Sequence, residues 1–395
     1  MIDGMNMFRR ELSRTLEERL REPRSFIQVV MGPRQTGKTT AIKQAVKATE
    51  LPVRVASADS AIELGADWIE LEWRQARNMT EPGAKAVLVL DEIQKVAQWS
   101  QTVKRLWDED SWNDTPLLVI LSGSSSLLIG SGLSESLAGR YELLRSTHWS
   151  LSEMSEAFGY NLSDYLEFGG YPGAAILKSD EDRWREYMRD SIVESTISRD
   201  VLQMENVRKP ALMRALFELG AQYSAQELSY RKILGQLDDK GNTDTIKHYL
   251  DLLSGAGMTS GLQKFDDKPI RAKASSPRLM VHDPALMTSM WHGKGSLLED
   301  PDLYGHLVET AVGAYLIARS ALDGFDLYWW REGDLEVDFV LRRARNTTAI
   351  EVKSGRVSKS GMGAFCKAYP KARPIIVGDR NTPLEDFLRG KVPLF

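Results

Sequence analysis

A short apolar run, followed directly by a glycine-rich turn and an amphipathic segment, constrains this chain most. Residues 26–31 (FIQVVM) are apolar and partly β-branched, GPRQTGKTT follows at once, and AIKQAVKATE then carries apolar residues at helical spacing. This order predicts a buried strand, a tight loop and a helix that begins inside the motif. Such a unit belongs in an α/β fold built on a parallel sheet.

The chemistry of the loop explains its residues. Gly32 and Gly37 allow the backbone to wrap with its N–H groups pointing inward, where they meet phosphate oxygens at the positive end of a helix. Lys38 can then reach the β- and γ-phosphates, and the Thr39 hydroxyl can ligate Mg²⁺. We therefore predict ATP and Mg²⁺ as cofactors. The residues of this loop predicted to bind the nucleotide are Gly32, Pro33, Arg34, Gln35, Thr36, Gly37, Lys38, Thr39 and Thr40.

A second strand supplies acids at the position that such a site requires. AVLVLDEIQ (residues 86–94) is continuously apolar until Asp91 and Glu92, a pattern typical of a parallel strand buried on both faces. Ligands of doubly wound sheets bind at the carboxyl ends of the strands. Asp91 is therefore predicted to hold Mg²⁺, and Glu92 to orient the attacking water.

Two further features extend the predicted nucleotide site. PLLVILSGS (residues 116–124) ends in small polar residues, so Ser122 or Ser124 can sense the γ-phosphate, although an ordinary strand-to-loop turn has the same composition. Arg140 follows a glycine and precedes the strand-like YELL. It is predicted to act as an arginine finger across a subunit interface, with a solvated surface arginine as the alternative.

The segment after the nucleotide sheet is predicted to be helical and to form a lid over residues 151–207, interrupted by FGGYP at residues 168–172. From residue 208 to 290, short amphipathic helices and then an alternating ribbon describe a winged helix. The ribbon and the last of these helices are rich in basic residues. They are Lys247, His248, Lys264, Lys268, Arg271, Lys273 and Arg278.

The function of this winged helix stays open between two alternatives. The basic residues can contact DNA phosphates while the helix enters a groove. Interspersed acids, among them Asp266 and Asp267, equally fit a solvated face that binds protein. His282 and His292 match no standard zinc spacing and are expected to be ordinary core or surface histidines.

A hairpin in the last part of the chain carries carboxylates among apolar residues (residues 328–355, YWWREGDLEVDFVLRRARNTTAIEVKSG). Strand alternation places Glu336 and Asp338 on one face, with Val337 and Phe339 on the other. Glu336 is expected to be a neighbour of the site rather than a ligand.

The second strand of the hairpin carries Glu351 and Lys353 on one face. A turn near Ala344 sets Asp338 across from Glu351, with Cβ atoms about 5 Å apart. Two facing carboxylates repel unless a cation or a proton intervenes. Mg²⁺ accepts such carboxylates, and Lys353 would then position the attacking hydroxide. Without further context, a solvated charged face explains the same residues.

The motifs GPRQTGKT, LVLDEIQ, LSGSSSLL, LAGR and FGGYP, in this order and spacing, resemble those of AAA+ ATPases that carry a C-terminal domain of unknown function with a nuclease-like core. One departure is HWSLSEM, where the family has a proline-containing turn. The hairpin with its preceding helix is similar to the PD-(D/E)XK nuclease core. That resemblance implies metal ligands at Glu309, Asp338 and Glu351, and a catalytic role for Lys353.

The resulting fold class is α/β, with an AAA+ core at residues 1–150, the lid at 151–207, the winged helix at 208–290 and a restriction-endonuclease-like domain at 291–395. The net charge of -4 excludes a wholesale basic coat, and a single cysteine, Cys366, excludes an internal disulfide. Neither a signal peptide nor about 18 consecutive apolar residues occur, so a cytoplasmic protein without membrane contact is expected.

The sequence patterns described above are compatible with three functions. The first is an ATP-driven protein that acts on DNA, self-associates into a ring or another homo-oligomer, and cuts DNA with Mg²⁺. The second is a nucleotide-switched regulatory or scaffold ATPase whose C-terminal domain only binds. The third is a motor that moves DNA junctions and carries an inert nuclease fold.

Overall fold

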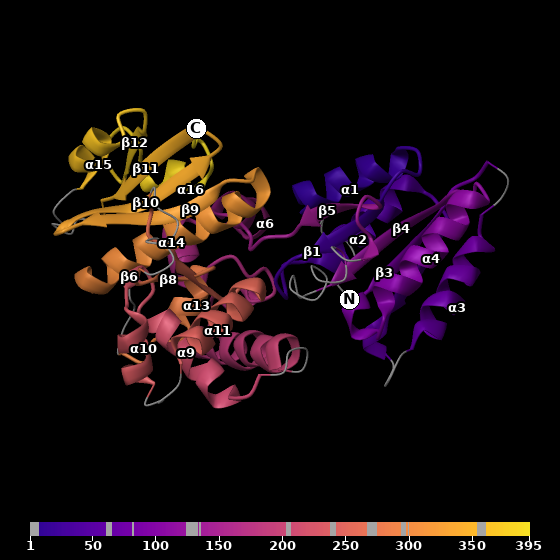
Figure 1. The fold of residues 1–395 in the computed structure, drawn as a ribbon, viewed down its shortest axis with the longest axis horizontal. Helices are drawn as coiled ribbons and strands as arrows, with labels where there is room; N and C mark the ends of the chain where they lie inside the picture. Colours follow the sequence, from indigo (N-terminus) through magenta and orange to yellow (C-terminus); the bar gives the residue numbers. More distant parts are fainter. Residues whose placement is uncertain are drawn as a thin grey trace. The chain divides into compact units, whose positions relative to one another are not determined.

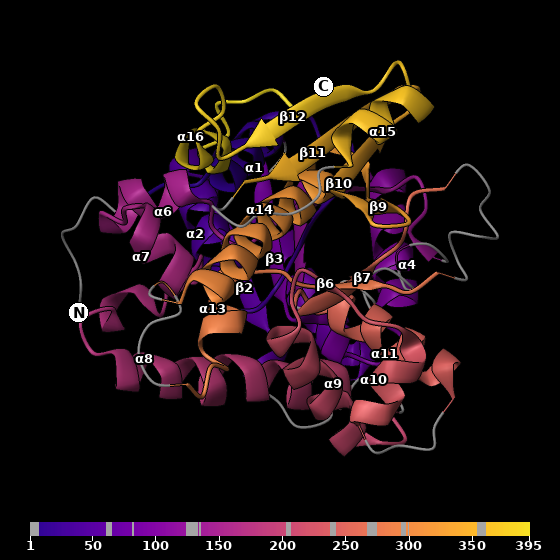
Figure 2. The same cartoon turned by 90° about the vertical axis from the view of Figure 1, so that its left-hand side faces the viewer.

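A computed structural model describes residues 8–60, 65–80, 83–123, 133, 136–202, 207–237, 242–266, 275–293, 298, 300–353 and 361–395. The chain divides into two compact units, Met1–Ser146 and Thr147–Phe395. The ribbon is drawn in Figures 1 and 2.

The first unit is built on a parallel sheet with the strand order β2-β3-β4-β1-β5. Its strands are β1 (Ile27–Met31), β2 (Val53–Ser57), β3 (Ala86–Asp91), β4 (Leu117–Gly123) and β5 (Tyr141–Arg145). Its longer helices are α1 (Glu11–Arg21), α2 (Lys38–Thr49), α3 (Ala66–Arg77) and α4 (Trp99–Trp112). The predicted α/β fold with a buried parallel sheet is confirmed.

Helices cover both faces of this sheet (Figure 1). One face packs against α3 and α4 through large side chains such as Trp73 and Trp107. The other face packs against α1 and α2 through Leu16 and Ile42. Strands β3 and β4 are buried on both faces, and their sequences are apolar until the polar residues at their carboxyl ends. Strand β1 is equally buried and includes one polar residue, Gln28.

The second unit begins with helices that lead into a small antiparallel sheet of strand order β6-β8-β7. Their bounds are α6 (Leu151–Phe158), α7 (Leu162–Phe168), η3 (Ala175–Leu177), α8 (Glu181–Glu186), η4 (Tyr187–Glu194), η5 (Thr196–Leu202), α9 (Pro210–Gln222), β6 (Gln226–Glu227), α10 (Tyr230–Gln236), α11 (Thr243–Gly255), β7 (Thr259–Leu262), β8 (Arg278–Val281) and α13 (Pro284–Thr288). The segments η4 and η5 are π-helical.

The C-terminal part of this unit contains a mixed sheet with the order β12-β11-β10-β9. Its elements are α14 (Pro301–Asp323), β9 (Asp326–Glu332), β10 (Leu335–Arg343), β11 (Asn346–Val352), α15 (Met362–Ala368), β12 (Arg373–Val377) and α16 (Leu384–Leu388). The predicted turn lies between β10 and β11, with Ala344 in the left-handed region at φ 54°. In the antiparallel pairing of β10 with β11, Phe339 lies opposite Ile350, and one further step in that register sets Asp338 opposite Glu351.

The structure corrects the predicted alternation along β10. A register shift between Val337 and Val340 interrupts its pairing with β9. Val337 and Val340 consequently both belong to the cluster under α15, whereas Phe339 lies beside Gly313 of α14. Strict alternation had placed Val337 and Phe339 on the same face, and a bulge of this kind cannot be read from period-two patterning.

Of the helices inside the described ranges, none has the length and apolar character needed to cross a membrane.

Candidate functional site

The loop between β1 and α2 contains left-handed backbone at two positions. Gly37 is left-handed at φ 82° and immediately precedes α2, and Gln35 is left-handed at φ 59°. Gly32 is required for a further reason, because a Cβ there would lie 2.0 Å from the carbonyl oxygen of Ser146. The loop is therefore seated against the end of the neighbouring strand.

Lys38 bends back over this loop. Its Nζ donates hydrogen bonds to the carbonyl oxygens of Gly32 at 2.9 Å and Pro33 at 2.7 Å. The lysine is buried at 7% exposure, and these backbone carbonyls accept from its ammonium. A phosphate group at this position would offer the ammonium stronger, charged acceptors.

Thr39 and Asp91 meet at the carboxyl edge of the sheet. The Thr39 hydroxyl donates to Asp91 Oδ2 at 3.2 Å. The other oxygen, Asp91 Oδ1, accepts from the Ser122 hydroxyl and from the Glu92 backbone N–H at 3.1 Å. This donor set fits Mg²⁺, which prefers oxygen ligands and is often held by a hydroxyl and one carboxylate beside a nucleotide.

Glu92 lies beside this pair in a left-handed backbone conformation at φ 54°. Its Oε2 accepts from Gln94 Nε2 at 2.8 Å. Burial raises the pKa of the Glu92 carboxyl above its usual range, and the nearby charges of Arg34 and Lys38 limit the rise. A carboxylate with a raised pKa at such an edge is suited to accept a proton from water.

The other residues predicted for the nucleotide site differ in burial and in their partners. Thr36 is fully buried, and Thr40 is exposed on the first turn of α2. Arg140 forms a bidentate ion pair with Asp108 of α4, through Nε at 2.7 Å and Nη2 at 3.0 Å, and it is not part of the Lys38–Asp91 group. Ser124 lies outside the described residues, so Ser122 is the one of the two predicted sensors that can be placed.

A buried arginine beneath the loop was not predicted from the sequence. Arg10, which precedes α1, is 7% exposed and donates through Nη1 to the carbonyl oxygen of Thr36 at 3.0 Å and to Ser146 Oγ at 3.2 Å. In the sequence it is one of several charges in a helical segment, and nothing in that pattern distinguishes it from a solvated arginine.

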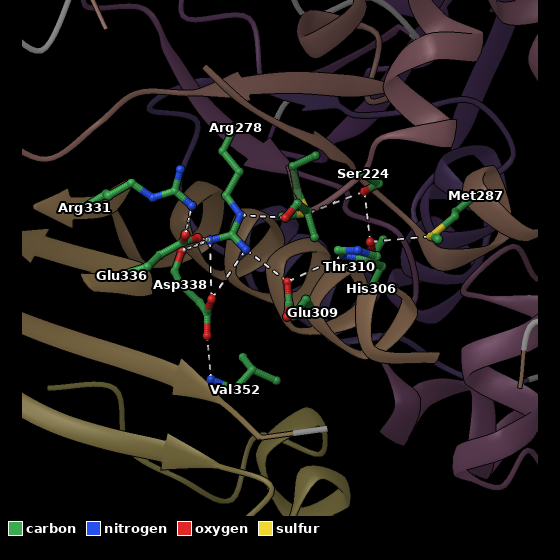
Figure 3. A network of polar contacts seen from close by, with 12 residues as sticks. Ser224, Arg278, Met287, His306, Glu309, Thr310, Arg331, Glu336, Asp338 and Val352 are labelled. Atoms are coloured by element: carbon green, nitrogen blue, oxygen red, sulfur yellow. Dashed lines mark hydrogen bonds and ion pairs between the residues drawn. The ribbon is translucent and has the colours of Figure 1, made fainter. Parts of the chain in front are cut away.

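The predicted metal site of the second unit contains a guanidinium group (Figure 3). Arg278 of β8 extends toward β10 and α14 at 3% exposure. It donates to Glu309 Oε2 at 3.0 Å, to Glu336 Oε1 at 2.8 Å, and to Asp338 Oδ1 at 3.4 Å. Its Nε is anchored on the carbonyl oxygen of Ala225 at 2.9 Å. We refer to Arg278, Glu309, Glu336 and Asp338 as the arginine–acid centre.

Glu351, the remaining acid of the predicted site, pairs with a different cation. Glu351 is 2% exposed and is ion-paired with Lys353. Asp338 Oδ2 accepts from the backbone N–H of Val352 at 2.8 Å. Burial raises the pKa of the Asp338 carboxyl, and Arg278 opposes that rise. Within the residues that the structure describes, no group of three His, Cys, Asp or Glu side chains can hold a metal ion.

The residues present therefore do not fit a resident divalent cation in this centre. Glu309 and Asp338 do come together, as predicted, but the positive charge between them is the guanidinium of Arg278. Glu336, expected to be a bystander, is a full member and also pairs with Arg331.

The assignment of Arg278 to an exposed basic ribbon is thereby corrected. The cation lies inside the unit because buried carboxylates supply the partners that its burial requires. Of the other basic residues expected on the ribbon, Lys264 is half-buried, and Lys268, Arg271 and Lys273 lie outside the described residues. On α11, His248 is exposed, and the Lys247 ammonium lies 5.1 Å from the centroid of the Tyr230 ring.

The FGGYP turn is explained by a buried aspartate that sequence reasoning missed. Asp283 is fully buried and accepts from the backbone N–H of Gly170 at 2.9 Å and of Ala285 at 2.9 Å. A Cβ on Gly169 would lie 1.9 Å from Asp283 Oδ1. The two glycines are thus needed for the close approach of this carboxyl, a contact across more than a hundred residues.

This carboxyl gives a pH prediction. Burial raises the pKa of Asp283 to about 7 from 3.8. Between these values the folded chain holds a proton that the unfolded chain has lost. Stability therefore falls as the pH rises through this window and levels off above pH 7. A shift of about 3 units corresponds to roughly 4 kcal/mol.

The measurement is urea-induced unfolding of the Asp283→Asn variant and the unchanged protein at several pH values. The difference in unfolding free energy between them should vary steeply between pH 4 and 7. Asp386→Asn serves as the control, because that carboxyl is partly exposed in an ion pair with Lys391. An Asp283→Asn variant whose pH dependence equals that of the unchanged protein would contradict the assignment.

Comparison with protein families divides the chain into three matched regions. Residues 24–155 match the family model of an AAA domain. Residues 159–297 match a domain of unknown function, DUF8612, and residues 304–391 match another, DUF4143. No curated protein sequence matches the chain. The region that matches the AAA domain model thus contains the loop between β1 and α2 and the acids Asp91 and Glu92.

Among solved structures, the Holliday junction branch migration motor RuvB of Thermotoga maritima matches at 18% identity, covering 64% of this chain and 87% of that one, with a TM-score of 0.35. A single-substitution variant of the same protein matches at 17% identity over the same shares, also with a TM-score of 0.35. A similarity of this size carries no inference about function.

Proposed function

We propose that the chain is an ATP-hydrolysing AAA+ protein that engages DNA through its second unit without cutting it. The observation that carries the ATPase part is the hydrogen bond from Thr39 to Asp91 at the carboxyl end of β3, together with Lys38, whose ammonium lies against the loop between β1 and α2. Thr39 and Asp91 would hold Mg²⁺, which neutralises phosphate charge when bound. Lys38 would exchange its two carbonyl partners for phosphate oxygens.

Glu92 is proposed to accept the proton of the attacking water. Glu92→Gln keeps the shape and the hydrogen bond from Gln94 but removes the base. We expect it to bind ATP as the unchanged protein does and to hydrolyse it roughly 10²–10⁴ times more slowly. Phosphate release at saturating ATP and titration with a fluorescent ATP analogue separate the two effects. A Glu92→Gln protein with unchanged turnover would remove Glu92 from this role.

The proposal of DNA binding rests on the order of elements in residues 210–281. Helices α9, α10 and α11 are followed by β7 and β8, and β8 pairs with both β6 and β7. This order supports a winged helix, in which the last helix enters a groove. His248 on the outer face of α11 and Lys247 beside Tyr230 are the described residues best placed for phosphate contact.

A salt titration tests this surface. Binding of a fluorescently labelled DNA duplex should weaken as salt rises, and Lys247→Ala should reduce the slope of log affinity against log salt by about 0.9 for one lost phosphate contact. Lys391→Ala is the matched control, because Lys391 is exposed and paired with Asp386. A Lys247→Ala protein with the unchanged slope would show that α11 does not contact DNA.

The arginine–acid centre favours the non-cleaving alternative over the nuclease. Cleavage by a nuclease-like core needs a divalent cation between its carboxylates. Here a guanidinium anchored on Ala225 contacts Glu309, Glu336 and Asp338 at once. A divalent cation at the same place would overlap with the Arg278 side chain and would be repelled by its positive charge. We therefore propose that this domain supports binding and does not cut.

A ring or another homo-oligomer remains part of the proposal through Arg140. Its bidentate pair with Asp108 would have to open for Arg140 to reach a neighbouring nucleotide. Side-chain exposures of 32% and 39% keep this pair within reach of solvent, where ion pairs are worth about 1 kcal/mol or less.

A further inference from the structure

The phosphate-binding loop is connected to the end of the first unit by a continuous chain of hydrogen bonds. The Thr36 hydroxyl donates to the carbonyl oxygen of Pro33 at 3.0 Å and lies 2.9 Å from Ser146 Oγ. A hydroxyl has one hydrogen to give. Since that of Thr36 is used on Pro33, Ser146 must be the donor to Thr36.

Arg10 completes this chain from the other side. Its Nη1 donates to Ser146 Oγ at 3.2 Å, which leaves the Ser146 hydrogen free to point at Thr36. The order of donation is therefore Arg10 to Ser146, Ser146 to Thr36, and Thr36 to the Pro33 carbonyl. Thr36 and Ser146 are almost fully buried, at 0% and 3% exposure, and chains of this kind polarise one another where water is absent.

The same Pro33 carbonyl also accepts from Lys38. Lys38 Nζ donates to it at 2.7 Å and to Gly32 at 2.9 Å. When Lys38 turns to phosphate, the Pro33 carbonyl keeps its hydrogen bond from Thr36 and the Gly32 carbonyl loses its bond from Lys38. Gly32 is the residue whose missing side chain makes room for the Ser146 carbonyl. Both changes affect residues that lie against Ser146, namely Thr36 and Gly32.

Ser146 occupies a particular place in the chain. Its backbone N–H donates to the carbonyl oxygen of Met31 at 2.6 Å, at the end of β1. It is also the last residue of the first compact unit, and Thr147 begins the second. The residue by which the chain leaves the first unit thus contacts the loop that precedes α2.

We propose that Arg10, Thr36 and Ser146 form a relay that reports occupation of the phosphate-binding loop to the segment entering the second unit. Arg10 and Ser146 are positioning residues, which act on the loop through Thr36. The inference rests on the proposed nucleotide site, because its input is the movement of Lys38 from carbonyls to phosphate. Its output is a change in the local stability of residues 146–149.

Hydrogen exchange of the full chain, with and without ATP and Mg²⁺, tests the relay. In the unchanged protein, nucleotide should alter amide exchange in residues 146–149 by roughly threefold or more. Ser146→Ala breaks the chain at its middle and Arg10→Gln at its start. Both should still bind the fluorescent ATP analogue and should lose the change at residues 146–149. Arg10→Lys retains a cation and should restore part of it.

Ser111→Ala is the matched control, because Ser111 is a hydroxyl of the same unit that bonds to Trp107 and Arg24 and not to the loop. It should keep the full response. A Ser146→Ala or Arg10→Gln protein that binds ATP and shows the unchanged response would overturn the relay. If the unchanged protein binds ATP without any response at residues 146–149, the relay also fails while the proposed function stands. If it binds no ATP, the proposed function itself fails.

Discussion

Replacing Arg278 by methionine should destabilise the second unit by about 3–5 kcal/mol, the range seen when one partner of a buried ion pair is removed. Methionine keeps an unbranched apolar stem but leaves Glu309, Glu336 and Asp338 without their shared cation. The guanidinium is nearly inaccessible to water, with its side chain 4% exposed. Native-state hydrogen exchange of β10 and α14 amides measures the change in the unit concerned.

Two further variants separate charge compensation from packing. Arg331→Met removes a partly exposed guanidinium that pairs with Glu227 and Glu336, and it should cost about 1 kcal/mol or less. Adding Glu309→Gln and Asp338→Asn to Arg278→Met should recover much of the lost stability. If Arg278→Met costs no more than Arg331→Met, the arginine–acid centre does not hold the unit together.

The Arg278→Met protein should also become more stable as the pH falls. Without the guanidinium, burial and mutual repulsion raise the pKa values of the neighbouring carboxyls in the folded state, so folding takes up protons. Acidification should therefore narrow the stability difference from the unchanged protein. A difference that widens at low pH would contradict this account of the charge balance.

Replacing Lys38 by alanine should reduce ATP hydrolysis by at least about 10²–10³, the cost of losing one strong electrostatic contact to the reacting group. The Lys38 ammonium is held at the loop by the carbonyl oxygens of Gly32 and Pro33, and it would exchange these partners for phosphate oxygens when the nucleotide binds. Phosphate release at saturating ATP measures the loss. The fluorescent ATP analogue shows how much of it arises from weaker binding.

Lys43→Ala is the matched control, because Lys43 is an exposed lysine of the same helix, α2. It should hydrolyse ATP at the unchanged rate. Equal losses in Lys38→Ala and Lys43→Ala would point to a damaged helix rather than to a lost phosphate contact, and unchanged hydrolysis in Lys38→Ala would remove the nucleotide site proposed here.

Local sequence patterns predicted the strands, the loop and the helix around the candidate nucleotide site for physical reasons. The loop, its helix and the acids at the end of β3 are set by residues close in sequence, and a parallel sheet brings strand ends together automatically. The turn at Ala344 was predicted for the same reason, because strand lengths on either side determine it.

What sequence patterns missed depends on contacts between distant residues. Arg278 resembled a solvated wing residue because its carboxylate partners follow 31 to 60 positions later. Asp283 gave no signal that it would meet Gly170. The bulge in β10 reversed the face of Phe339 without any glycine or proline to mark it. In each case a partner that is distant in sequence determines the environment of the residue, whereas the local sequence pattern indicated a different environment.

The most direct test of the account measures ATP hydrolysis and DNA integrity in one reaction. The unchanged protein is incubated with ATP, Mg²⁺ and duplex or branched DNA, phosphate release is followed with and without DNA, and the DNA is then resolved by electrophoresis. We predict ATP hydrolysis that rises with DNA and is lost in Lys38→Ala, with the DNA intact throughout. DNA cleavage that disappears in Asp338→Ala would contradict this prediction. A rate of ATP hydrolysis that does not change when DNA is added would contradict it as well.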